Sequence, residues 1–185
     1  ITAAEGRGTL PYFIKDNKKV VDGILNKSTD TREDNTKSPQ EIARIEANRK
    51  EYERLKNDKN YKDVEFNPKN GGLKATHSEH NIDKEKGWYE TKVQEIGFQQ
   101  GHSVILEKES GKGIGERYTE GSWDGSLFEL ASCETGTPNN IVRGLKHCSS
   151  KDNVEVAVIF LPNTEYNDPE FTRAISRYIG MINKG

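Results

Sequence analysis

Three acidic residues, Glu90, Asp124 and Glu129, occupy positions where a carboxylate could take part in a reaction. Glu129 lies in an alternating stretch over residues 126–131, so on a strand it points away from its apolar neighbours. A carboxylate there loses hydration energy unless it meets a partner, an ion or a solvent-filled cleft. Two or three converging carboxylates can hold a divalent metal ion that polarises a phosphate group and activates water. We therefore predict that these three residues are catalytic and that Asp124 and Glu129 bind the metal.

The position two residues after Glu129 is the natural place for a lysine, because it lies on the same strand face and a cation there would steady the developing charge. The chain has Ala131 at this position. We count Ala131 among the catalytic positions and treat it, as a hypothesis, as an inactivating replacement of lysine. The short spacing from Asp124 to Glu129 also leaves Glu116 or Glu120 open as the second acid.

A second candidate group is His77 and His80, three residues apart. They could act as base and acid in metal-free RNA cleavage, in which one histidine deprotonates the ribose 2′-hydroxyl and the other protonates the leaving oxygen. They could also bind zinc, although further ligands are not evident in the sequence. Surface histidines without a function are an equally open interpretation.

Four basic residues are candidates for contacts with a nucleic-acid backbone. Lys112 and Arg117 lie in and after a glycine-rich stretch that lacks the phosphate-loop pattern. Arg143 and Lys146 share a helix face with His147, and the placement of this helix beside the strand of Glu129 suits phosphate contacts. The net charge of −2 argues against binding to nucleic acid by bulk positive charge, but not against local basic patches.

The elements that must position these residues are read from periodicity and from turn and cap signals. Ser38, Pro39 and Glu41 form a helix-start pattern. We predict helices over residues 38–57, 85–100 and 138–149 and a last helix from Asp168, with strands over residues 64–66, 73–76, 103–108, 116–121, 126–131 and 154–161. The fold class expected is α/β (α+β), with a mixed central β-sheet flanked by helices.

Composition suggests one domain with an appendage. Only 31% of the 185 residues are hydrophobic, and the apolar residues concentrate after residue 60. We expect a weakly structured linker region over residues 1–37, an N-terminal helical arm over residues 38–60 and the main domain over residues 61–185. Cys133 and Cys148 are too few for a disulfide framework, so we interpret them as core thiols. No apolar run approaches the ~20 residues that span a bilayer.

From residue 85, the order of elements, with an acid on the first helix, an aspartate before the third strand and an acid-x-lysine position on it, resembles the PD-(D/E)xK restriction-endonuclease-like fold. It is similar in particular to the C-terminal nuclease domains of bacterial polymorphic and contact-dependent growth inhibition (CDI) toxins, several of which cut tRNA or DNA. The similarity covers residues 60–182 and rests on Gly87-Trp88-Tyr89-Glu90, residues 101–106, Asn139-Asn140-Ile141 and Leu145-Lys146.

This resemblance implies a toxin nuclease that hydrolyses phosphodiester bonds of nucleic acid, RNA and particularly tRNA before DNA, with a divalent metal (Mg²⁺ or Zn²⁺). It also implies a cognate immunity protein as partner. Because the chain begins with Ile1 and shows no signal peptide, we expect a fragment of a larger secreted effector that acts in the target-cell cytoplasm.

Two alternatives stay open. A metal-independent ribonuclease using His77 and His80 would belong with the barnase, EndoU, colicin and RelE-like toxins. A non-catalytic interaction domain of a phage or mobile-element protein would make Ala131 a native residue. Loss of cleavage in chelator separates the metal-dependent site from the histidine site.

Overall fold

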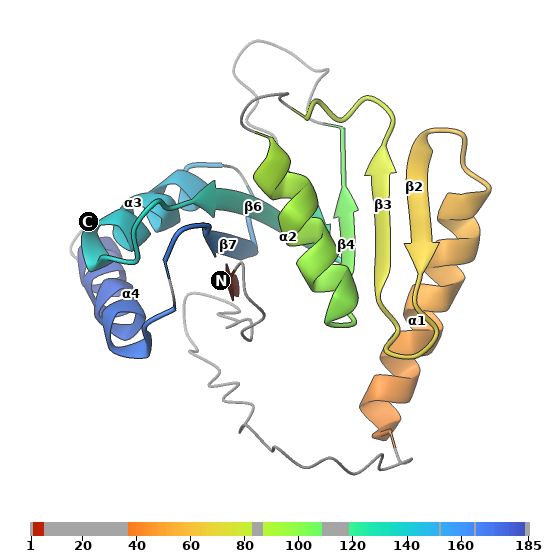
Figure 1. Ribbon diagram of the computed structural model, residues 1–185, viewed down its shortest axis with the longest axis horizontal. Coiled ribbons are helices and arrows are strands. Elements are labelled where there is room, and N and C mark those ends of the chain that lie inside the picture. The colour runs from red at the N-terminus through yellow and green to blue at the C-terminus, as the bar shows by residue number, and fades with distance from the viewer. Residues whose placement is uncertain are drawn as a thin grey trace.

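A seven-stranded mixed sheet forms the centre of the molecule, in the strand order β1-β7-β6-β5-β4-β3-β2 (Figure 1). The computed structural model describes residues 37–82, 87–108, 119–151, 153–164 and 166–183, and the backbone of residues 2–5. In these residues four helices flank the sheet. The predicted class, a mixed β-sheet flanked by helices, is confirmed.

The strands combine an antiparallel meander with parallel neighbours. Antiparallel pairs join β2 to β3, β4 to β5 and β5 to β6, whereas β3 with β4, β6 with β7 and β1 with β7 are parallel. The strands are β1 (Thr2–Glu5), β2 (Tyr61–Phe66), β3 (Leu73–His77), β4 (Ser103–Leu106), β5 (Gly121–Trp123), β6 (Ser126–Ser132) and β7 (Val156–Leu161).

Alternation along the strands gives the sheet two packed faces. Helix α2 (Trp88–Gln99) covers one face, where Val93 packs on Val104, Trp123 and Phe128. Helices α3 (Pro138–Ser149) and α4 (Asp168–Ile182) cover the other face beside β6 and β7. Helix α1 (Pro39–Lys56) packs on that same side over β2 and β3, through Leu55. Figure 1 shows α2 on the near side of the strands and α1 behind β2.

The predicted start of α1 is confirmed in detail. The Ser38 side chain accepts a hydrogen bond from the backbone N–H of Glu41, and the Glu41 carboxylate accepts one from the N–H of Ser38. This capping box satisfies two amide groups that the first helical turn leaves without partners. The helix therefore begins where the sequence pattern places it, and Pro39 occupies the first turn.

The order helix, three strands, helix, strand, helix from α2 to α4 is as predicted. The position of β5 differs from the prediction: it covers Gly121–Trp123, whereas the strand was expected over residues 116–121. Residues 116–118 lie outside the described residues. Thr2–Glu5 forms a strand at the sheet edge, within the region expected to be a linker. Cys133 and Cys148 are free and buried, as expected of core thiols.

None of the helices in the described part of the chain has the length and apolar character needed to cross a membrane.

Candidate functional site

Glu129 lies at the middle of β6 and is 1% exposed. Its Oε1 atom is 3.1 Å from Nε2 of His147 on α3 and 3.4 Å from Nζ of Lys151, which follows that helix. Its Oε2 atom is buried and makes no hydrogen bond to any residue that the structure describes. The strand acid therefore has two basic partners and one oxygen that remains available for a further ligand.

Burial raises the pKa of the Glu129 carboxyl, and the charges and hydrogen bonds of Lys151 and His147 only partly oppose this effect. The ionised form is thus disfavoured by the site as a whole. The side chain of His147 is 54% exposed, so one end of this pair reaches solvent. A desolvated carboxylate joined to an accessible imidazole is an arrangement that can orient a proton acceptor.

A cavity of about 560 Å³ lies between the end of β6, α3 and the first turn of α2. Arg143 and His147 line it from α3, and Glu134 adds a carboxylate. Its lining residues are Tyr89, Leu130, Ala131, Ser132, Cys133, Glu134, Asn140, Arg143, Gly144 and His147. The volume is within the range of small-molecule sites, and guanidinium, imidazole, carboxylate, amide and hydroxyl groups line it.

Ala131 is part of the cavity wall, on the face of β6 that also carries Glu129. An ideal Cβ built on Gly144 would lie 3.3 Å from the Ala131 Cβ, so α3 passes close to the strand here. A lysine in place of Ala131 would have to direct its side chain into the cavity. Glu129 and residue 131 lie on the same face of β6, as predicted. That Ala131 is an inactivating replacement of a lysine stays a hypothesis.

Asp124 lies in a different place. It forms the two-residue turn between β5 and β6 with Gly125, and both have positive φ (49° and 82°), as an Asp-Gly hairpin turn requires. Its Oδ1 accepts a hydrogen bond from the Ser103 N–H and its Oδ2 lies 2.6 Å from Nδ1 of His102. These contacts attach the hairpin to the start of β4.

The structure therefore does not bring Asp124 and Glu129 together. Glu129 is three residues into β6, which places it about 10 Å from the hairpin end at about 3.3 Å per residue. The two carboxylates contact separate groups, since Asp124 contacts β4 and Glu129 contacts α3. The physical reason is that both belong to one extended strand and its turn, which separates them along the sheet.

Glu90 meets His80 instead. Glu90 is in the first turn of α2, and its Oε2 atom is 3.1 Å from Nε2 of His80. Glu120, the alternative acid, completes a group in which one ligand atom from each residue lies within 4.8 Å of the others. Among the described residues, this is the one group of three or more potential metal ligands at such distances.

His77 and His80 point to different surroundings. The His77 ring packs edge-on against Tyr61, and its Nδ1 accepts a hydrogen bond from the Glu79 N–H. His80 is buried, and its two nitrogens face Glu107 and Glu90. The geometry therefore does not present these two histidines as an acid and a base on either side of one phosphodiester.

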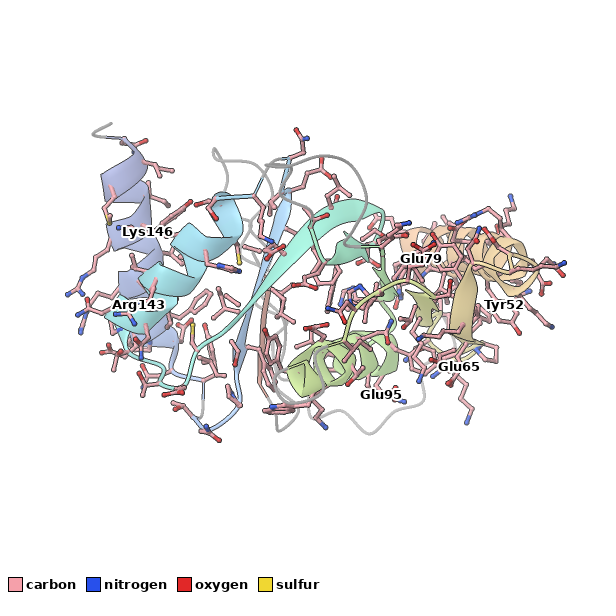
Figure 2. The ribbon with its side chains drawn as sticks, turned by 90° about the horizontal axis from the view of Figure 1, so that it is seen from above. Tyr52, Glu65, Glu79, Glu95, Arg143 and Lys146 are labelled. Atoms are coloured by element: carbon pink, nitrogen blue, oxygen red, sulfur yellow. The ribbon has the colours of Figure 1, made fainter. Side chains whose placement is uncertain are left out.

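Of the predicted backbone contacts, Arg143 and Lys146 are exposed on α3 (Figure 2), and Arg143 also lines the cavity. Lys112 and Arg117 lie outside the described residues. The sequence interpretation did not include Lys151 or Tyr89 among the site residues. Lys151 stands four residues after His147, a spacing that could have drawn attention to it, but the contact with Glu129 depends on where α3 ends.

Comparisons of the chain with models of known protein families, with curated proteins and with solved structures found no match.

Proposed function

We propose that this chain is a nuclease domain that cleaves phosphodiester bonds of nucleic acid at the cavity beside Glu129. The observation that carries this proposal is the buried Glu129 carboxylate in contact with His147 and Lys151. His147 also lines the neighbouring cavity, together with Arg143. The group unites what phosphoryl chemistry needs: an oriented proton acceptor and cations that offset the charge of the phosphate.

In the proposed reaction, His147 donates its Nε2–H to Glu129, which leaves Nδ1 as the proton-accepting nitrogen. Nδ1 makes no hydrogen bond to the residues that the structure describes, and the ring is accessible. It would remove the proton of the nucleophile, either water or a ribose 2′-hydroxyl. The nucleophile then attacks phosphorus, the bond to the leaving oxygen breaks, and this oxygen takes a proton from water.

Arg143 and Lys151 would bind the phosphate as its negative charge grows. Lys146, one turn along the exposed side of α3, would contact a neighbouring backbone phosphate. RNA is favoured as substrate, tRNA included, because its 2′-hydroxyl supplies an internal nucleophile. A divalent ion at Glu129 Oε2 is compatible with the same site, because this buried oxygen accepts no hydrogen bond from the described residues.

The biological setting is proposed from the resemblance. A nuclease of this kind would be carried by a larger secreted effector, act in the cytoplasm of a target cell and be neutralised in its producer by a cognate immunity protein. Inducible expression in bacteria tests the setting: growth should stop with the active chain and continue with Glu129→Gln.

The direct test is cleavage of tRNA, total RNA and plasmid DNA by the purified chain and by Ala131→Lys. Glu129→Gln should reduce cleavage by about 100-fold or more, because it removes the negative charge that stabilises His147 as it takes up a proton. Glu46→Gln, an exposed carboxylate on α1, is the matched control and should cleave normally. Each assay is repeated with chelator to decide whether a metal ion is needed.

The outcomes separate the proposals. Cleavage that depends on Glu129 supports the nuclease, and its persistence in chelator would assign the reaction to a metal-free mechanism. If neither the chain nor Ala131→Lys cleaves any of these nucleic acids, the proposal fails and the non-catalytic interaction domain is favoured.

A further inference from the structure

A second histidine–carboxylate group lies on the α2 side of the sheet. His80 follows β3, Glu90 is in the first turn of α2, and Glu120 immediately precedes β5. His80 and Glu90 are buried and Glu120 is partly buried. One ligand atom from each residue lies within 4.8 Å of the other two. Three chain segments that are distant in sequence thus bring one imidazole and two carboxylates to one point.

The hydrogen bond of His80 to the backbone determines which of its nitrogens carries a proton. Nδ1 lies 2.6 Å from the carbonyl oxygen of Glu107. A carbonyl oxygen can only accept, so Nδ1 carries a hydrogen and donates it. In the neutral imidazole, Nε2 is then a lone pair directed at Glu90 Oε2, 3.1 Å away. A lone pair facing a carboxylate oxygen is repulsive, so a positive charge must lie between them: either a second ring proton, which makes His80 and Glu90 an ion pair, or a metal ion.

The arrangement matches the second shell of a metal site. Histidines that bind metals commonly donate their other N–H to a backbone carbonyl, which sets the tautomer and the ring orientation. Two ligands at about 2.0–2.1 Å from a tetrahedral or octahedral ion stand about 3 Å apart, close to the 3.1 Å between Nε2 and Oε2. A divalent ion would also offset the repulsion between the two carboxylates.

We propose that His80, Glu90 and Glu120 form a binding site for one divalent transition-metal ion, with zinc preferred to manganese and magnesium. One nitrogen and two oxygen ligands suit a borderline ion such as zinc better than magnesium, which prefers oxygen ligands alone. Three protein ligands leave a position on a tetrahedral ion for water or a substrate oxygen. Because Tyr89 lines the cavity and Glu90 is the next residue, the first turn of α2 links this site to the cavity.

This metal site does not rest on the proposed nuclease function, because its evidence lies in different residues. The test is calorimetric titration of the metal-free chain with Zn²⁺, Mn²⁺ and Mg²⁺ separately, together with the shift in melting temperature that each ion causes. His80→Ala and Glu120→Gln remove one ligand each. His77→Ala and Glu46→Gln are the matched controls, one histidine and one glutamate that lie outside the group.

We expect the chain to bind one zinc ion. The affinity for zinc should fall by about tenfold or more in His80→Ala and Glu120→Gln and should be unchanged in both controls. Glu120 is partly buried, so we expect Glu120→Gln to remain folded even if removal of the buried His80 side chain unfolds the chain, and circular dichroism verifies this. Absence of stoichiometric binding by the chain overturns the proposal, and so does binding that both ligand variants retain. Because the readout is metal binding, a failed nuclease assay does not affect it.

Discussion

The α3 side and the α2 side of the sheet each hold one histidine 3.1 Å from a buried glutamate. On the α3 side, His147 is more than half exposed, whereas on the α2 side the His80 side chain is fully buried with both nitrogens engaged. The same residue pair therefore suits different chemistry depending on whether the imidazole is accessible to solvent. An exposed imidazole can exchange protons with a substrate, whereas a buried imidazole of fixed tautomer is suited to holding a cation.

The two histidine–glutamate pairs also differ in the charged residues beside them. Lys151 contacts Glu129 directly, so the α3 site contains its own cation. The α2 site instead adds a second carboxylate, Glu120, which increases the negative charge at one point. The first arrangement favours binding of a phosphate, and the second favours binding of a metal ion.

The strongest test of this division is His147→Ala. We expect cleavage to fall by about 10²–10⁴-fold, because the substitution removes the proton acceptor while Glu129 and Lys151 remain. Zinc affinity should not change, since His147 is not part of the α2 group. The measurement is the initial rate of RNA cleavage by each variant.

His77→Ala is the matched histidine control for this experiment, because His77 packs against Tyr61 outside both sites. Full activity in His147→Ala with loss in His77→Ala would reverse the assignment and favour the histidine-based ribonuclease that the sequence suggested.

Ala131→Lys should have the next largest effect. The lysine side chain would enter the cavity near Glu129 and supply a further cation for the phosphate, so we expect cleavage to increase by about tenfold or more. Ala131→Met has a side chain of similar length without charge and separates the electrostatic effect from filling of the cavity. Equal rates for the chain and both variants would contradict the hypothesis that this alanine replaces a catalytic lysine.

The local structure was largely predictable from the sequence because its signals are local. The capping box at Ser38, the proline at the start of α3 and the alternation along β6 each reflect interactions within a few residues. The sequence also predicted that Glu129 and Ala131 share one face of a strand and that the helix of His147 lies beside that strand.

Which acidic residues lie close together in the fold was not predictable from such local signals. Asp124 occurs in an Asp-Gly pair, a strong hairpin signal that gives this residue a structural role and removes it from Glu129. The group of His80, Glu90 and Glu120 needs the segment after β3, the start of α2 and the start of β5 to meet. Such a meeting depends on sheet order and helix placement, which no spacing in the chain specifies.

On the α2 side, Gln94 maintains the position of the helix that carries Glu90. Its buried Nε2 donates to the carbonyl oxygen of Ala75 on β3 and lies 3.3 Å from that of Val104 on β4. Gln94→Leu should lower the free energy of unfolding by about 1–3 kcal/mol, because it removes the buried hydrogen bonds that join the helix to β3 and β4. Gln99→Leu, exposed on the same helix, is the control for chemical denaturation and should have little effect.

On the α3 side, we expect a smaller, pH-dependent change in the free energy of unfolding, caused by Glu129. Since burial raises the pKa of Glu129 in the folded state, the folded chain binds this proton more tightly than the unfolded chain does. The stability that this group contributes is therefore fully present below its ordinary pKa of 4.5 and is lost as the pH rises through the raised value. Glu129→Gln mimics the protonated carboxyl and should avoid that loss.

We therefore expect Glu129→Gln to be more stable than the parent chain by on the order of 1 kcal/mol at pH 8, with the difference disappearing below about pH 4.5. Urea denaturation of both chains across this pH range measures the difference, and Glu46→Gln corrects for the loss of one surface charge. A variant less stable than the parent at pH 8 would mean that the contacts with His147 and Lys151 outweigh the cost of burial. A gain in stability with a loss of cleavage would instead indicate that the ionised carboxylate is retained for its chemistry.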